Sequence, residues 1–127
     1  MEITTATAAD VDEAVACLAS AFAEDPITGF LLEFGPGYRE RVTQFFSLLM
    51  TARLELGMPV LLARDQGRIQ GAVMGYATEP PEWPAALAEA WGRFEASIAG
   101  LGDRLAVYDH VADKYRPAAP HSARSPR

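Results

Sequence analysis

Apolar residues recur at helical spacing in two early stretches of the chain. Within each stretch they stand four, three and four residues apart, which is the repeat of one face of an amphipathic helix. These positions are Val11, Val15, Leu18 and Phe22 in the first stretch and Tyr38, Val42, Phe45 and Leu49 in the second. We therefore predict helices over residues 8–23 and 38–56. Residues 27–34 between them form a short apolar segment, either one or two helical turns or a loop.

Residues 3–6 and 60–76 have the pattern of strands. Ile3–Ala6 is a short β-prone start, and the apolar run Val60–Arg64 is followed by the turn Asp65–Arg68 and a second run, Ile69–Tyr76. Two such runs joined by a short turn predict an antiparallel hairpin. Strict alternation divides the second run into Ile69, Gly71, Val73 and Gly75 on one face and Gln70, Ala72, Met74 and Tyr76 on the other.

Two more helical stripes follow the hairpin. They consist of Trp83, Leu87, Trp91, Phe94 and Ile98, then Leu101, Leu105, Tyr108, Ala112 and Tyr115. Gly100 and Gly102 separate the stripes, and Pro117 ends the second. The order of elements predicts an α+β fold, with about three antiparallel strands packed with four to five helices.

Composition narrows the classes of function. The chain has 127 residues and a net charge of −6, so we expect one acidic domain that does not bind nucleic acid, because a nucleic-acid groove needs clustered Lys and Arg. No apolar stretch approaches the roughly 20 residues that span a bilayer, and no signal peptide is recognisable at the start. We expect a cytoplasmic location and no membrane partner. Cys17 is the only cysteine, which excludes an intrachain disulfide and a cysteine-based zinc cluster.

The charge changes sign near the end of the chain. All 17 acidic residues lie at or before Asp113, and residues 1–113 carry a net charge of −10. Residues 114–127 contain four basic residues and no acid. We therefore divide the chain into a domain at 1–116 and a disordered Pro/Ser/Arg tail at 117–127. Two origins of the tail stay open, a frameshift scar or a native tail.

Several segments, in this order, resemble the amino-terminal half of the GNAT superfamily of N-acyltransferases. Residues 3–11 are similar to the first strand and the start of the first helix of that family. Residues 21–27 are similar to the link between its first two helices, and residues 62–73 to its second and third strands. Trp83-Pro84 and the two helices after it are similar to a helical insertion in one subfamily. The resemblance spans about residues 2–121, and the order of the segments carries it.

The resemblance implies acetyl transfer from acetyl-CoA to a small amine. In the family a fourth strand comes next, and His121 is similar to its leading residue. A Gly-rich turn that binds the pyrophosphate of acetyl-CoA then follows. Ser122–Arg127 contains no glycine, so we expect a chain truncated before the acyl-CoA motif. We assign no cofactor-binding or metal-binding residues and expect no tight binding of acetyl-CoA. Two alternatives are half of an enzyme completed by a partner chain, and a non-catalytic binding or dimerising module that pairs through its open sheet edge.

Four residues are candidates for the chemistry that the resemblance implies. Glu24, Asp25 and Trp83 are candidates for binding the acceptor amine, and Glu79 is a catalytic candidate that could orient a water as a general base. Each has a structural alternative: a solvated helix end for the two adjacent acids, a loop charge for Glu79 and core packing for the tryptophan. His110 and Asp113 are one turn apart, and a surface ion pair is the alternative to any catalytic use.

Overall fold

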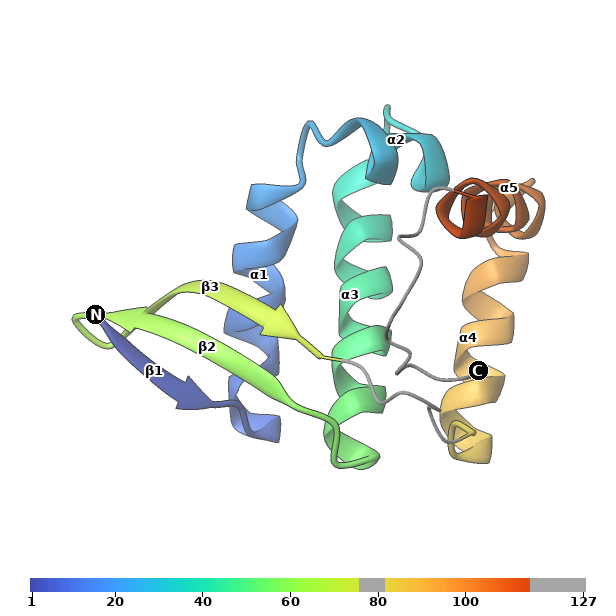
Figure 1. Cartoon of the computed structure of the whole chain (residues 1–127). Coiled ribbons are helices and arrows are strands. Elements are labelled where there is room, and N and C mark those ends of the chain that lie inside the picture. The colour runs from blue at the N-terminus through green and yellow to red at the C-terminus, as the bar shows by residue number, and fades with distance from the viewer. Residues whose placement is uncertain (76–81, 115–127) are drawn as a thin grey trace.

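A computed structural model describes residues 1–75 and 82–114 (Figure 1). The fold is α+β, and the described residues form a three-stranded antiparallel sheet and five α-helices, which confirms the predicted class. The elements are β1 (Glu2–Thr5), the 3₁₀ helix η1 (Ala8–Asp10), α1 (Val11–Ala21), α2 (Pro26–Leu32), α3 (Tyr38–Glu55), β2 (Val60–Asp65), β3 (Arg68–Met74), α4 (Ala85–Ala96) and α5 (Leu101–Lys114). The tail predicted at 117–127 lies outside the described residues.

The strands lie in the order β1-β2-β3, and the sheet is open at both edges within the described part of the chain. Gln66 and Gly67 connect β2 to β3 with φ angles of 55° and 79°, the positive values of the tight turns that suit a twisted hairpin. Ala63 is opposite Gly71 and Arg64 is opposite Ile69, so Gln70 is an extra residue in a β-bulge.

The bulge corrects the predicted alternation of β3. Strict alternation grouped Ile69 with Gly71 and Val73. In the structure Ile69 is buried on the same face as Ala72 and Met74, because the extra residue reverses the direction of every side chain before it. Val73, on the opposite face, is 65% exposed.

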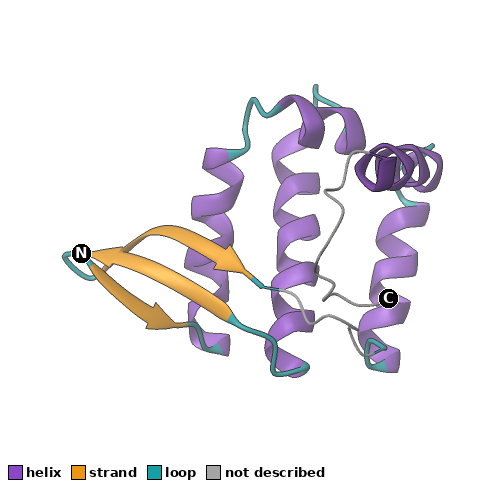
Figure 2. Ribbon diagram, viewed as in Figure 1, coloured by secondary structure: helices purple, strands orange, loops and turns teal. Residues whose placement is uncertain are grey.

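The helices lie on one side of the sheet (Figure 2). Val60, Leu62 and Ile69 point toward them and join one core cluster with the buried residues of α1 and α3. The other side of the sheet presents Ile3, Leu61 and Val73 to solvent. No described element covers that side, so the described fold is two layers, helices on sheet.

The predicted helix boundaries hold with small shifts. Residues 27–32 of the apolar segment 27–34 are helical in α2, and the last two lie in the turn after it. The helix predicted to start near Trp83 begins two residues later, at Ala85, with Trp83 in the loop before it. Gly57 has a φ of 72° just after α3, and the N–H of Met58 donates to the carbonyl of Arg53 at 2.8 Å. This is the glycine C-terminal motif that the sequence predicts there.

Two arginines hold the carbonyl end of α2. Arg41 Nε, from α3, donates to Leu32 O at 2.6 Å, and Arg104 Nε, from α5, donates to Leu31 O at 3.0 Å. Arg104 also forms an ion pair with Glu33 at 3.3 Å. Cations at a helix C-terminus satisfy its free carbonyls and oppose its dipole, so α2 is attached to both α3 and α5.

Within the described residues, no single helix is long and apolar enough to cross a membrane. One pair of helices bent by 108°, Ala8–Ala21 with Pro26–Leu32, passes the same test of length and composition when taken together. Ala14, Val15 and Leu32 of this pair belong to the core cluster, as residues of a core helix do.

Candidate functional site

The tryptophan predicted to bind substrate lines an apolar cavity. Trp83 and Trp91 meet edge to face, with ring centroids 5.9 Å apart. Together with Leu49 of α3 and Ala88 of α4 they line an open hollow of about 260 Å³. Trp91 Nε1 donates to Glu95 Oε1 at 3.1 Å, which satisfies the polar atom of a half-buried indole. The cavity could hold a small apolar group between α3 and α4.

A buried arginine lies beside this cavity, and the sequence patterns did not single it out as functional. Arg53 of α3 is 8% exposed. Its Nε donates to Gly75 O at 3.0 Å, and its Nη1 donates to Leu49 O at 3.2 Å. Leu49 is also one of the residues that line the cavity. The arginine therefore joins the end of β3 to α3. Its position on the helical stripe was visible in the sequence, but its carbonyl partners depend on the packing of β3.

The two predicted acidic residues have different surroundings. Glu24 is exposed in the loop between α1 and α2. Asp25 is the N-cap of α2, because its Oδ2 accepts from the Thr28 backbone N–H at 2.8 Å and from Thr28 Oγ1 at 2.9 Å. Asp25 therefore has a structural role at the start of α2, with one carboxylate oxygen engaged by the protein itself, and its role in binding an acceptor stays a prediction.

Tyr38, at the start of α3, lies next to this loop and has a shifted pKa. Tyr38 Oη donates to Phe22 O at 2.8 Å and the residue is buried. Burial raises the pKa of Tyr38, and the negative charge of Asp25 raises it further. The hydroxyl therefore keeps its proton at neutral pH and acts as a structural donor between α1 and α3.

The structure does not bring the predicted site residues together. The α1–α2 loop with Glu24 and Asp25 lies at one end of the helical layer, and the start of α4, next to Trp83, lies at the other (Figure 1). Glu79, the catalytic candidate, lies outside the described residues. A single acceptor site that uses both the acidic pair and the tryptophan is therefore not formed within the described residues.

A second hollow of about 450 Å³ lies between α3 and α4. Its polar side chains are Thr43, Gln44, Ser47, Arg93 and Ser97. Ser97 Oγ donates to Phe94 O at 2.6 Å, and Arg93 forms an exposed ion pair with Glu89 at 3.7 Å. The wall thus combines hydroxyls with one cation, but its polar groups are mostly exposed.

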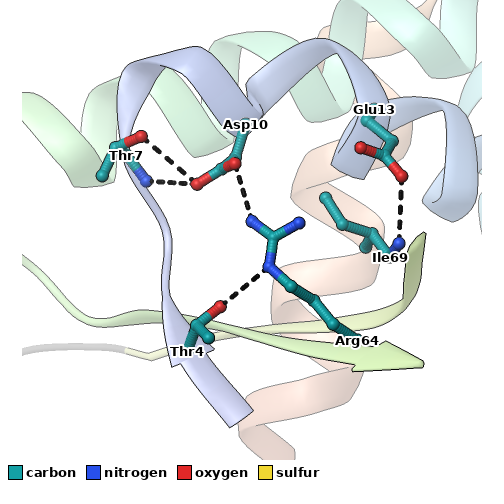
Figure 3. Close-up of polar contacts among 6 residues, drawn as sticks. All are labelled: Thr4, Thr7, Asp10, Glu13, Arg64 and Ile69. Atoms are coloured by element: carbon teal, nitrogen blue, oxygen red, sulfur yellow. Dashed lines mark hydrogen bonds and ion pairs between the residues drawn. The ribbon is translucent and has the colours of Figure 1, made fainter. Parts of the chain in front are cut away.

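A cluster of polar side chains connects the sheet to the start of α1 (Figure 3). Arg64 Nη2 of β2 meets Asp10 Oδ1 at 2.7 Å, and Arg64 Nε donates to Thr4 Oγ1 at 3.2 Å. The Thr7 backbone N–H donates to Asp10 Oδ2 at 2.9 Å, the return contact expected of a capping box. This hydrogen bond and then the Arg64 contact lower the pKa of Asp10 below its ordinary value. Every member has a protein partner, so the cluster is structural.

A single carboxylate closes part of the sheet edge beside this cluster. Glu13 Oε2 of α1 accepts from the backbone N–H of Ile69 at 3.0 Å (Figure 3). Among the described residues no group of three or more His, Cys, Asp or Glu side chains could hold a metal ion. His110 is exposed on α5.

Comparison with known proteins adds no assignment. No protein-family model matches the chain. No curated protein matches it at a significant level. The geometry of the described residues is therefore what bears on function.

Proposed function

We propose that this chain is the acceptor-side, amino-terminal half of a GNAT-type N-acyltransferase, and that it does not transfer acetyl groups by itself. One observation supports the proposal most: the sheet order β1-β2-β3 is antiparallel, with the helices α1, α2 and α3 inserted between β1 and β2. This is the arrangement that the sequence resemblance implies for the first half of that family. No described residue pairs with the outer edge of the third strand, where the family would place its fourth strand.

The described residues do not fit the pyrophosphate of acetyl-CoA. Such a group is usually bound by backbone N–H groups of a Gly-rich turn at a helix N-terminus. Gly35-Pro36-Gly37 precedes α3, but Arg41 Nη1 donates to Pro36 O at 3.0 Å and Tyr38 N–H to Gly35 O at 3.0 Å, which closes the turn on itself. We therefore derive no reaction step that involves acetyl-CoA on this chain.

On this proposal the described residues serve the acceptor. The apolar cavity beside Trp83 and Trp91 would hold the hydrocarbon part of a small amine. Glu24 is exposed in the α1–α2 loop, at the other end of the helical layer from this cavity, so its part in attracting a cationic amine stays a separate prediction. Glu79 stays the candidate for the general base.

Isothermal titration calorimetry with acetyl-CoA tests the proposal on the whole 127-residue chain. We expect no saturable heat at up to millimolar acetyl-CoA, while an intact acetyltransferase measured in the same buffer gives a micromolar dissociation constant. A micromolar constant for the chain alone would overturn the proposal that the acyl-CoA side is missing.

A co-purification experiment tests whether activity survives through a partner. Proteins retained by the tagged chain are assayed with it for acetyl-CoA consumption in the presence of small primary amines. Acetylation that needs both components supports half of an enzyme completed by a partner chain. Absence of turnover with every retained protein rejects that alternative and leaves an acceptor-side half without activity.

A further inference from the structure

The backbone of β3 has two residues whose hydrogen-bonding groups point away from the sheet. The N–H of Gly75 donates to Pro59 O at 2.9 Å, which directs Gly75, Val73 and Gly71 toward β2. In an antiparallel ladder the intervening residues face the other way. Ala72 and Met74 therefore direct their N–H and C=O groups to the open edge, and no described residue pairs with them.

The protein itself limits how much of this edge is available. The outward N–H of Ile69 is already bonded to Glu13, and Gln70 forms the bulge, so regular pairing stops there. What remains is a regular stretch at Gly71–Gly75, which is about the length of an ordinary short strand. The Glu13 carboxylate occupies the backbone N–H at one end of the β3 edge, and a charged side chain placed in this way restricts strand pairing at a sheet edge.

The helical layer continues past this edge. Figure 1 shows that α1 and α3 extend beyond β3 on the side away from β2. A strand added beside β3 would therefore have helices behind it and could bury one of its faces. Packing against helices is what makes a short strand stable, because hydrogen bonds between strands alone are marginal.

The same overhang disfavours a second folded copy that pairs β3 with β3. Two antiparallel β3 strands related by a two-fold axis would place both helical layers on the same face, with the strands about 4.8 Å apart. Each copy would bring its own helices behind the paired strands, on the side where α1 already passes the edge of β3. A dimer through the open edge stays a prediction.

The side chains around the free stretch define the chemistry of the partner. No charged residue occurs in Ile69–Gly75, and Ala72 and Met74 pack partly against the core on the helix side. An added strand therefore needs uncharged residues on the face toward α1 and α3. Glu13 at the bulged end favours a basic residue at the matching end of the partner.

We propose that the β3 edge at Gly71–Gly75 binds an extended, alternately apolar peptide segment of another polypeptide by strand addition. The inference concerns backbone pairing and needs no acyl chemistry, so its failure is separate from a failure of the proposed function. We take the strand to come without a helical layer of its own, because the helices of this chain already extend past the edge of β3.

Amide hydrogen exchange of the whole chain, followed by NMR, tests the proposal. The probe is a capped peptide of sequence Lys-Val-Thr-Val-Thr-Val-Lys, with the same peptide N-methylated at its valines as the negative probe. At millimolar peptide we expect exchange of the Ala72 and Met74 amides to slow at least 10-fold. The Ile69 amide, already bonded to Glu13, should not change.

Two variants make the test specific to one edge. Ala72→Pro removes an N–H that points to the open edge and leaves every hydrogen bond between β2 and β3 in place. Edge strands tolerate proline at such a position. We expect this variant to bind the peptide at least 10-fold more weakly. Thr5→Pro removes the equivalent outward N–H on β1 and should leave binding unchanged. Circular dichroism establishes that both variants are folded; if Ala72→Pro is not, the N-methylated peptide alone decides.

Three results would overturn the proposal. The first is no protection of Ala72 and Met74 by the peptide. The second is protection of both amides in the free chain, which would mean that the edge is already occupied. The third is a dimer in light scattering that Ala72→Pro abolishes, which would make a second copy the occupant.

Discussion

At the scale of single residues, Asp25 has a definite task that does not require a substrate. Its carboxylate receives both the backbone N–H and the hydroxyl of Thr28, and Thr28 is 7% exposed. Pro26 follows as the first residue of α2, where its missing N–H costs nothing. The sequence segment that resembles a substrate-binding link is thus also a well-formed helix start.

We predict that Asp25→Ala lowers the free energy of unfolding by about 1 kcal/mol, the usual cost of an N-cap. Urea denaturation followed by circular dichroism measures the change. Glu24→Ala is the matched control, since it removes a neighbouring negative charge that caps nothing, and its effect should stay within about 0.5 kcal/mol. Equal effects of the two substitutions would contradict the capping role.

At the scale of elements, Arg64 connects β2 to the start of α1. Its guanidinium lies between Asp10 of η1 and Thr4 of β1, so three elements meet at one side chain (Figure 3). Asp10 accepts from Thr7 as well, and these contacts lower its pKa below the ordinary 3.8. Because the pKa of Asp10 is lower in the folded state than in the unfolded state, its carboxylate stabilises the fold at pH values above the unfolded-state pKa. This contribution is lost as the pH falls through the folded-state pKa.

We therefore predict a pH-dependent difference between the natural chain and Asp10→Asn. At pH 5–7 the natural chain should be the more stable of the two, because Asp10 is ionised and paired. The difference in urea midpoint should narrow steadily as the pH falls below about 4 and disappear once Asp10 is protonated. Midpoints measured from pH 7 to pH 2.5 decide the matter, and curves that stay parallel over the whole range would contradict the assigned role.

Much of the element structure follows from local patterns in the sequence. Val11, Val15 and Leu18 recur at helical spacing and are half-buried or buried on α1, and Gly57 ends α3 with the positive φ that glycine permits. The bulge at Gln70 was not predicted, because it depends on how β3 pairs with β2 and on the Glu13 contact at Ile69. Periodicity describes one element at a time, and a bulge is a property of two strands.

The candidate site was harder to predict, for a related reason. Trp83 was assigned from an aromatic stripe, and the cavity at its side needs Leu49 from a helix more than thirty residues away. Glu24 and Trp83 each have a reasonable local pattern, but their separation at opposite ends of the helical layer is set by the packing of α1, α3 and α4. The resemblance suggests Glu24 and the aromatic stripe suggests Trp83 for binding the same acceptor, and the described fold keeps the two apart.

At the scale of the whole molecule, the sheet has two unlike faces. The helix side carries Val60 and Leu62, which are fully buried, while the other side carries Ile3 and Val73, each about two-thirds exposed. Exposed apolar residues that face solvent singly are normal, but here they lie on paired strands of one sheet. The described residues thus form two layers, with apolar side chains on the face of the sheet that no described element covers.

Neighbouring leucines in β2 test this arrangement directly. Leu62 is 0% exposed and Leu61 is 42% exposed, although they are adjacent and of the same type. We predict that Leu62→Ala lowers the free energy of unfolding by about 2–5 kcal/mol, because it opens a cavity among core residues. Leu61→Ala should cost less than about 1 kcal/mol, because water already reaches that side chain.

The relative costs of Leu61→Ala and Leu62→Ala report both the register of β2 and whether the outer face of the sheet is covered. A one-residue slip of β2 would exchange the two effects, since adjacent side chains of a strand point to opposite faces. A cost for Leu61→Ala as large as that for Leu62→Ala would mean that something buries the outer face in solution. If that cost also rises with protein concentration, a second copy is the cover, because a mutation at a dimer interface acts through mass action. A small, concentration-independent cost leaves the outer face bare, as the two-layer fold predicts.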